Sequence, residues 1–165
     1  MTPLGLRPYR PADDPPRGSV AVTVVVLTRD EEANIARCLG SVAWADQVNF
    51  KADLGGASEV PPVTTAGKGT ATASLDTATK TLTWTVTYSG LSGPATAGHI
   101  HGPAAAGANA GVLVPLSGSL ASPIKGSATL TDAQISDLEA GRTYLNLHTA
   151  DNKGGEIRGQ LVRTP

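Results

Sequence analysis

From Asn49 onward the chain is built of short apolar stretches separated by clusters of Gly, Pro, Asp, Asn and Ser. In the clearest stretch, from Thr81 to Tyr88, threonines alternate with apolar or aromatic residues. A period of two places the two sets of side chains on opposite faces of a half-buried strand. Many short strands divided by turn residues are typical of an antiparallel sandwich or barrel. We therefore predict an all-β domain with strands at 49–54, 69–75, 80–89, 95–101, 111–116, 124–130, 142–148 and 156–162.

One short helix is predicted among these strands. The sequence TDAQ at 131–134 has the spacing of a capping box, in which two side chains bind the free N–H groups of the first turn. Leu130 and Ile135 are spaced for the hydrophobic contact that often accompanies such a cap. Gly141 is suited to end the helix, because glycine adopts positive φ without a steric cost.

Residues 1–48 have a different pattern. Residues 1–18 are rich in proline, and we expect them to be disordered. Residues 19–28 form a near-continuous apolar run, typical of a strand buried on both faces, and the acidic residues of 29–34 then open a helix. The apolar stripe of that helix is Ile35, Leu39 and Val42. One strand and one helix make only an incomplete β-α unit.

Charge and cysteine content exclude several classes of function. The 165 residues include 13 basic and 14 acidic side chains, and a net charge of -1 gives no basic footprint for nucleic acid. Cys38 has no partner for an internal disulfide. No apolar run reaches the roughly 18–20 residues that cross a bilayer, and residues 1–18 lack the apolar centre of a secretory signal. As written, the chain is expected to be cytoplasmic and to have no transmembrane segment, while its oligomeric state stays open.

All three histidines fall in two of the predicted strands. His99 and His101 flank Ile100, so both face away from the core if Ile100 faces inward. His148 faces away likewise if Leu147 faces inward. Neutral imidazoles are ligands for copper and zinc. We expect a three-histidine copper or zinc site on the solvent face, with three separate side chains, each solvated or bonded to a neighbouring carbonyl, as the alternative.

Two charged residues belong to the same outward set. Glu156 and Arg158 alternate with Ile157 and Gly159 in the last predicted strand. They are candidates for orienting a ligand beside the histidines, and a simple cross-strand ion pair is an equal alternative. Glu59 is expected to be a strand-end residue. No catalytic residue is assigned, because the histidines lack the nucleophile context of a hydrolase.

Residues 19–48 resemble the start of an inverting GT-A glycosyltransferase. The matching sequence is VTVVVLTRDEEANIARCLGSVAWADQV. The second parallel strand and the Asp-x-Asp metal motif of that family do not follow. The resemblance therefore implies a truncated or fused fragment, with an active glycosyltransferase as a remote alternative.

Residues 49–162 resemble a CHRD domain, a module named after chordin and found widely in bacterial secreted proteins. The motifs that carry the resemblance are SEVPPV at 58–63, GTAT at 69–72, AGHIHGP at 97–103, LTDAQ at 130–134, NLHT at 146–149 and GGEIRGQL at 154–161. The resemblance implies that residues 49–165 form one extracellular or periplasmic domain that binds a protein or matrix partner. It implies a binding module rather than an enzyme.

The order of the histidines and of Arg158 is also similar to the copper half of Cu/Zn superoxide dismutase. This similarity implies an antiparallel Greek-key β-sandwich of the immunoglobulin or superoxide dismutase type. His99, His101 and His148 would take three copper-ligand positions, and Arg158 the position of an arginine that steers an anionic substrate. The histidine that bridges copper and zinc in that family has no counterpart here. A copper-dependent redox protein is thus the alternative to a non-catalytic binding domain.

Overall fold

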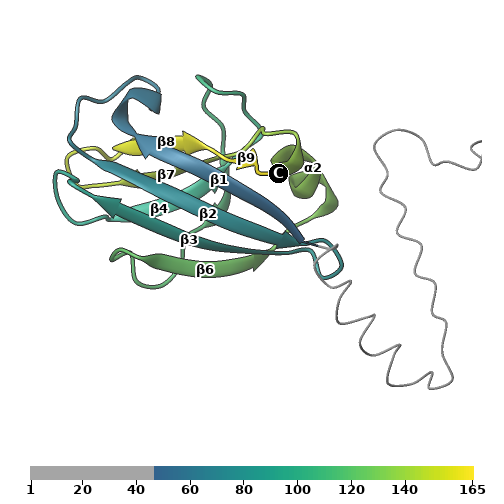
Figure 1. Ribbon diagram of the computed structural model, residues 1–165. Helices are drawn as coiled ribbons and strands as arrows, with labels where there is room; N and C mark the ends of the chain where they lie inside the picture. Colours follow the sequence, from purple (N-terminus) through teal and green to yellow (C-terminus); the bar gives the residue numbers. More distant parts are fainter. Residues whose placement is uncertain (1–46) are drawn as a thin grey trace, which may run out of the picture. The chain divides into compact units, whose positions relative to one another are not determined.

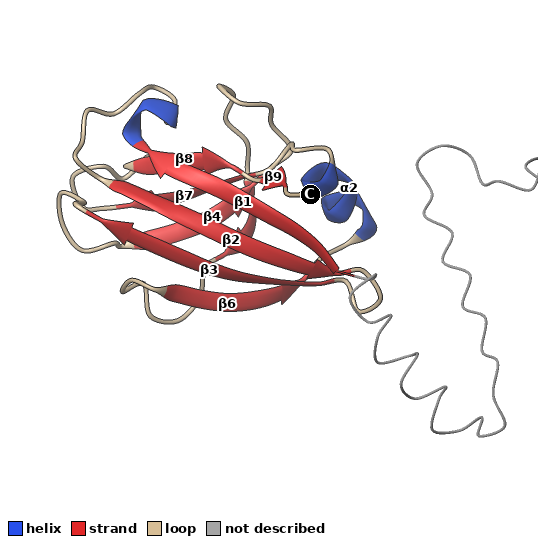
Figure 2. Ribbon diagram, viewed as in Figure 1, coloured by secondary structure: helices blue, strands red, loops and turns tan. Residues whose placement is uncertain are grey.

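The computed structural model describes residues 47–165, and the predicted β-α unit and proline-rich segment lie outside this part of the chain. The described residues form a β domain with one α-helix (Figures 1 and 2). Its elements are β1 (Gln47–Gly55), the 3-10 turn η3 (Gly56–Ser58), β2 (Lys68–Asp76), β3 (Thr81–Ser89), β4 (Ala97–His101), β5 (Val112–Pro115), β6 (Ile124–Thr129), α2 (Asp132–Glu139), β7 (Tyr144–His148), β8 (Ile157–Gln160) and β9 (Val162–Arg163). Each predicted strand overlaps an observed one.

The strands form a single antiparallel sheet in the order β5-β4-β7-β8-β1-β2-β3-β6, with β9 paired to β1. The sheet curls until it is nearly closed into a barrel, so that β1, β2, β3 and β6 lie in front of β4, β7 and β8 (Figure 1). The chain crosses between the two ends of the sheet from β3 to β4 and again from β5 to β6. The predicted all-β antiparallel class is confirmed.

Strand alternation builds the core as expected. In β3, Leu82, Trp84 and Val86 are buried, while the threonines between them face outward. Ile100 in β4 and Leu147 in β7 face the same interior. The other buried members of the core are Phe50, Ala52, Leu54, Ala71, Ala73, Leu75, Val114, Leu116, Ile124, Leu130, Leu138, Leu145, Ile157 and Leu161. This core leaves the opposite face of β4, β7 and β8 free for polar side chains.

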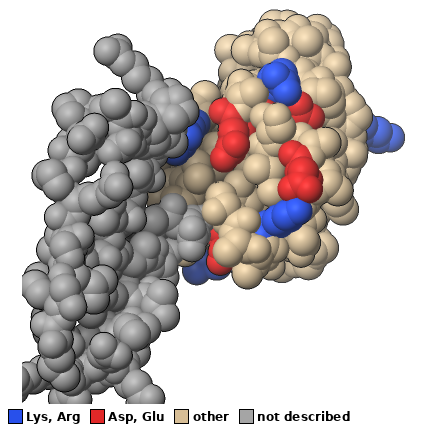
Figure 3. All heavy atoms as spheres, turned by 90° about the vertical axis from the view of Figure 1, so that its right-hand side faces the viewer, with Lys and Arg blue, Asp and Glu red and all other residues tan. Residues whose placement is uncertain are grey.

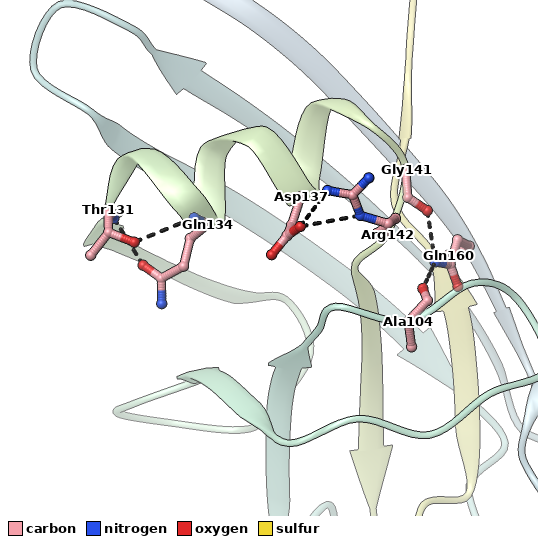
Figure 4. Close-up of polar contacts among 7 residues, drawn as sticks. All are labelled: Ala104, Thr131, Gln134, Asp137, Gly141, Arg142 and Gln160. Carbon is pink, nitrogen blue, oxygen red and sulfur yellow. Dashed lines mark hydrogen bonds and ion pairs between the residues drawn. The ribbon is translucent and has the colours of Figure 1, made fainter.

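The predicted helix forms with its predicted cap. The Thr131 hydroxyl accepts from the Gln134 N–H at 3.3 Å, and the Gln134 side chain accepts from the Thr131 N–H at 2.9 Å (Figure 4). Gly141 has a φ of 67° just beyond the helix, as a helix-ending glycine should. The next residue, Arg142, pairs with Asp137 at 2.6 Å.

The charged side chains on the face shown in Figure 3 are of both signs, and Lys or Arg lies next to Asp or Glu. Lys80, for example, pairs with Asp132 at 2.7 Å. Within residues 47–165, no helix is long and apolar enough to span a membrane.

Candidate metal centre

The pairing of β4 with β7 brings the three histidines together. His101 is opposite Tyr144, His99 is opposite Asn146, and Ala97 is opposite His148. Because Ile100, Leu145 and Leu147 face the core, these polar residues share the other face of the two strands. The histidines therefore occupy neighbouring positions on adjacent strands.

Their rings are in contact. His99 Nδ1 lies 3.0 Å from His148 Nε2, and the centroids of His99 and His101 are 5.3 Å apart. One ring nitrogen of each histidine lies within 4.8 Å of the others. Tetrahedral coordination at 2.0–2.1 Å needs nitrogens about 3.3 Å apart, so small ring movements would bring all three onto one ion.

Backbone carbonyls fix the tautomers of two of the rings. His101 Nδ1 lies 3.0 Å from the Ala110 carbonyl oxygen, and His148 Nδ1 lies 2.9 Å from the Lys153 carbonyl oxygen. A carbonyl only accepts, so both Nδ1 atoms carry the proton and both Nε2 atoms keep a lone pair. His101 Nε2 is buried and has no hydrogen-bond partner among the described residues. His148 Nε2 then accepts from the Nδ1–H of His99 at 3.0 Å, so of these two lone pairs only the one on His101 Nε2 is unused.

The surroundings of His99 and His148 favour the neutral form of these two rings. Burial lowers the pKa of His99, and the neighbouring His148 and His101 lower it further. Burial also lowers the pKa of His148, against the opposing effect of its bond to the Lys153 carbonyl. A neutral imidazole is the form that binds a metal ion.

The predicted solvent exposure of this face is wrong. His101 is only 9% exposed and His148 only 8%, while His99 is partly exposed. The face is turned away from the core, but the chain returns over it, since Ala110 and Lys153 belong to the connections that follow β4 and β7. A strand pattern separates two faces and does not show whether loops cover one of them.

Arg158 reaches the cluster through Tyr144. Its guanidinium carbon lies 3.3 Å from the centre of the Tyr144 ring, which is stacked on His101 with an interplanar angle of 5°. Two further contacts fix the guanidinium, one to Asn109 Oδ1 at 2.9 Å and one to the Ala108 carbonyl oxygen at 2.6 Å. Arg158 is buried, and it supports the His101 ring through the Tyr144 ring that lies between them.

Glu156 does not pair with Arg158. Its carboxylate accepts hydrogen bonds from the hydroxyls of Thr65, Ser92 and Thr149, each at 2.6 Å, and from the Ser92 N–H at 2.7 Å. Burial favours the neutral acid, but these bonds outweigh it and lower the pKa of Glu156 to about 2. The residue joins three loops at one end of the domain, so the predicted cross-strand ion pair is wrong.

A protein-family model described as the CHRD domain matches residues 50–161, more than half of the chain. The chain belongs to the CHRD domain family. Searches of curated proteins and of solved structures gave no match. The match does not include residues 19–48, so the resemblance of that segment to a glycosyltransferase stays a prediction.

Two residues of the CHRD domain were not expected near the histidines. Glu59 follows η3 directly and is 5% exposed, and the positive charge of Arg158 acts on its carboxyl group. Asn146 is 3% exposed and lies directly opposite His99 in β4 and Arg158 in β8. Alternation along β7 puts Asn146 on the face of His148, but the sequence analysis assigned it no role, and no short motif distinguishes Glu59 from an ordinary strand-end carboxylate.

Proposed function

We propose that this CHRD domain is a non-catalytic binding module that holds one copper ion, or a zinc ion in its place, on His99, His101 and His148. The observation that carries the proposal is the buried, unpartnered Nε2 of His101, which lies in a group of three convergent ring nitrogens. A buried polar atom without a partner costs about 1–3 kcal/mol, and a metal ion would remove that cost.

The donor set suits these metals. Three neutral imidazoles carry no negative charge, whereas calcium and magnesium prefer carboxylate and carbonyl oxygens. Among divalent ions copper binds nitrogen sites more tightly than zinc. We therefore expect the domain to prefer Cu(II) over Zn(II).

Calorimetric titration of the full chain with Cu(II) and with Zn(II) tests the proposal. We expect one ion per chain, and loss of binding when all three histidines are replaced by alanine. A matched control replaces Thr72, Thr83 and Thr85 by alanine, because these residues lie on the outward face of β2 and β3. Equal weak binding by all three proteins would reject the metal site.

A copper-dependent redox activity is a second candidate, favoured by the partial exposure of His99. A copper ion beside that ring would be open to a small molecule from solvent, and copper supplies one-electron chemistry when bound. Reversible reduction of the copper-loaded chain by ascorbate, with turnover of superoxide above that of free copper, would support this candidate. Binding without turnover would leave only the binding module.

The partner and the location belong to the same proposal. We propose that the module binds a protein or matrix partner outside the cytoplasm, in line with the secreted proteins in which CHRD domains are found. Fractionation of cells that express the full gene with a C-terminal tag tests the location. Recovery of the tagged chain only from the cytoplasm would contradict it.

A further inference from the structure

Asn146 stands in the middle of the histidine cluster. It lies between Tyr144 and His148 on one face of β7 and is directly opposite His99 in β4. Directly opposed residues in an antiparallel pair have Cβ atoms about 4.5–5.5 Å apart, within reach of a short side chain. No other side chain of β7 has histidines both beside it and opposite it.

The orientation of the Asn146 amide follows from its neighbour Glu59. A Cβ placed on Gly155 would overlap Glu59 Oε1 and would lie 2.8 Å from Asn146 Nδ2, so both atoms lie over the bare Cα of that glycine. A carboxylate accepts hydrogen bonds and does not donate them. The Asn146 NH₂ group therefore lies on the Glu59 side of the amide, where Glu59 Oε1 has no other hydrogen-bond partner among the described residues.

That oxygen is unused. Asn146 Oδ1 is buried and has no hydrogen-bond partner in the part of the chain described, and the same is true of His101 Nε2. Two unpartnered polar atoms on paired strands are costly in a metal-free domain. Both costs would be removed together if the two atoms bound the same ion.

We propose that Asn146 Oδ1 is the fourth ligand of the three-histidine site, and that Glu59 is the positioning residue that orients its amide. This proposal rests on the proposed metal function. Four donors complete the coordination of zinc, or the four close positions around Cu(II). The donor set of three imidazoles and one amide is neutral, and Glu59 lies next to the amide.

Glu59 is itself held in place. Burial raises the pKa of its carboxyl group, while the charge of Arg158, the Val60 N–H and the Asn146 amide oppose that rise. A carboxylate that accepts from an amide nitrogen increases the electron density on the amide oxygen, which strengthens it as a ligand. Arg158 of β8 would thus act on Glu59, Glu59 on the Asn146 amide, and Asn146 on the metal ion.

The test compares the wild-type chain with Asn146→Leu, Asn146→Asp and Glu59→Gln. Affinities for Cu(II) and Zn(II) are measured by calorimetry, and the Cu(II) ligand field by electron paramagnetic resonance. We expect Asn146→Leu, which removes a ligand, to lose at least the roughly 10–100-fold in affinity that loss of a supporting group costs, and to change the spectrum. Asn146→Asp keeps an oxygen ligand but sets a carboxylate against Glu59, so it should restore the affinity only in combination with Glu59→Gln, which supplies an amide donor at that position. Glu59→Gln should weaken binding less, with a small spectral change.

Asn49→Leu is the matched control, because Asn49 is an exposed asparagine of β1. Circular dichroism and thermal melting show whether each variant is folded before its affinity is compared. If Asn146→Leu is folded and keeps both the affinity and the spectrum of the wild type, the fourth-ligand assignment is overturned while the three-histidine site stands. If the wild type binds neither metal, both proposals fail.

Discussion

His101 is held by contacts on three sides of its ring. Its Nδ1 donates to the Ala110 carbonyl oxygen, one ring face is stacked on Tyr144, and the His99 ring approaches edge-on at 5.3 Å. A ring fixed in this way loses little further freedom when a ligand binds to its Nε2 atom. Because the ring is already held in place, a metal ion can bind tightly even when only a few side chains coordinate it.

Metal should therefore stabilise the fold through this residue. At a free Cu(II) concentration 100 times the Kd, binding to the native state alone adds about 2.7 kcal/mol to the free energy of unfolding. Urea unfolding with and without Cu(II) measures the difference, and a chelator should reverse it. His101→Phe keeps the stacked ring and removes the nitrogen, so its unfolding curve should not move with copper. An equal shift in this variant would place the metal elsewhere.

The free energy of unfolding should depend on pH through Glu156, because its hydrogen bonds lower the pKa of its carboxyl group in the folded state. Since its pKa in the native state is about 2, below the ordinary value of 4.5, the unfolded chain binds more protons between these limits. Stability from this group is complete above about pH 4.5 and is lost as the pH falls toward 2, by at most about 3 kcal/mol.

Urea unfolding of wild type and Glu156→Gln at pH 7, 4.5, 3 and 2.5 checks this. At pH 7 the variant should be less stable by about 2–3 kcal/mol, because a glutamine cannot accept the bonds from all three hydroxyls. The gap between the two proteins should narrow as the pH falls. Parallel stability curves from pH 7 to 2.5 would show that Glu156 does not titrate as described. Glu139→Gln is the control, since Glu139 is exposed at the end of α2.

At the scale of elements, α2 is the part of the fold that local sequence determines most fully. Its cap at Thr131 and Gln134 and its end at Gly141 follow from short-range bonds, and each was predictable from residue type and spacing. The strands were predictable in place, because buried and exposed side chains alternate along β1, β2 and β3.

Thr131→Ala removes one half of the capping box. We expect the free energy of unfolding to fall by about 1 kcal/mol, the usual cost of losing an N-cap side chain. Chemical denaturation measures this fall, and Ser136→Ala is the control, because Ser136 is exposed within the same helix. A loss no greater than that of the control would mean that α2 is held by packing of Leu138 alone.

The partners of the last strand could not be predicted. The stretch 156–162 was expected to be one strand, but β8 lies between β7 and β1, while β9, after a break at Leu161, pairs with β1 and no longer with β7. Leu161 is fully buried and its N–H donates to the Thr143 carbonyl oxygen. The sequence pattern does not show that the pairing with β7 stops at this point.

At the scale of the whole molecule, the long connections decide what the polar face becomes. Asn109 donates to the Val60 carbonyl oxygen and accepts from Arg158, so the loop after β4 is joined both to the segment after η3 and to the sheet. Each of these two bonds joins residues that are 49 positions apart in the sequence. The histidine face was predictable from strand periodicity, but the buried surroundings of Glu59, Asn146 and Arg158 depend on such long-range contacts.

Arg158→Lys tests the attachment of that loop. Lysine loses the paired contacts of the planar guanidinium and its stacking on Tyr144. We expect faster amide hydrogen exchange in residues 104–111 and a lower free energy of unfolding, by about 2–4 kcal/mol. Arg163→Lys, at an exposed position of β9, serves as the control. Unchanged exchange in 104–111 would show that other contacts hold the loop.

The two ends of the sheet bear on how a partner can attach. β5 is four residues long and ends in Pro115, which has no N–H group. β6 follows Pro123, and its second residue is the exposed Lys125. Short strands, proline and lysine at sheet edges oppose the addition of a foreign strand and the aggregation that follows from it. A partner of this domain therefore has to recognise side chains and loops, since the backbone at either edge gives it little to extend.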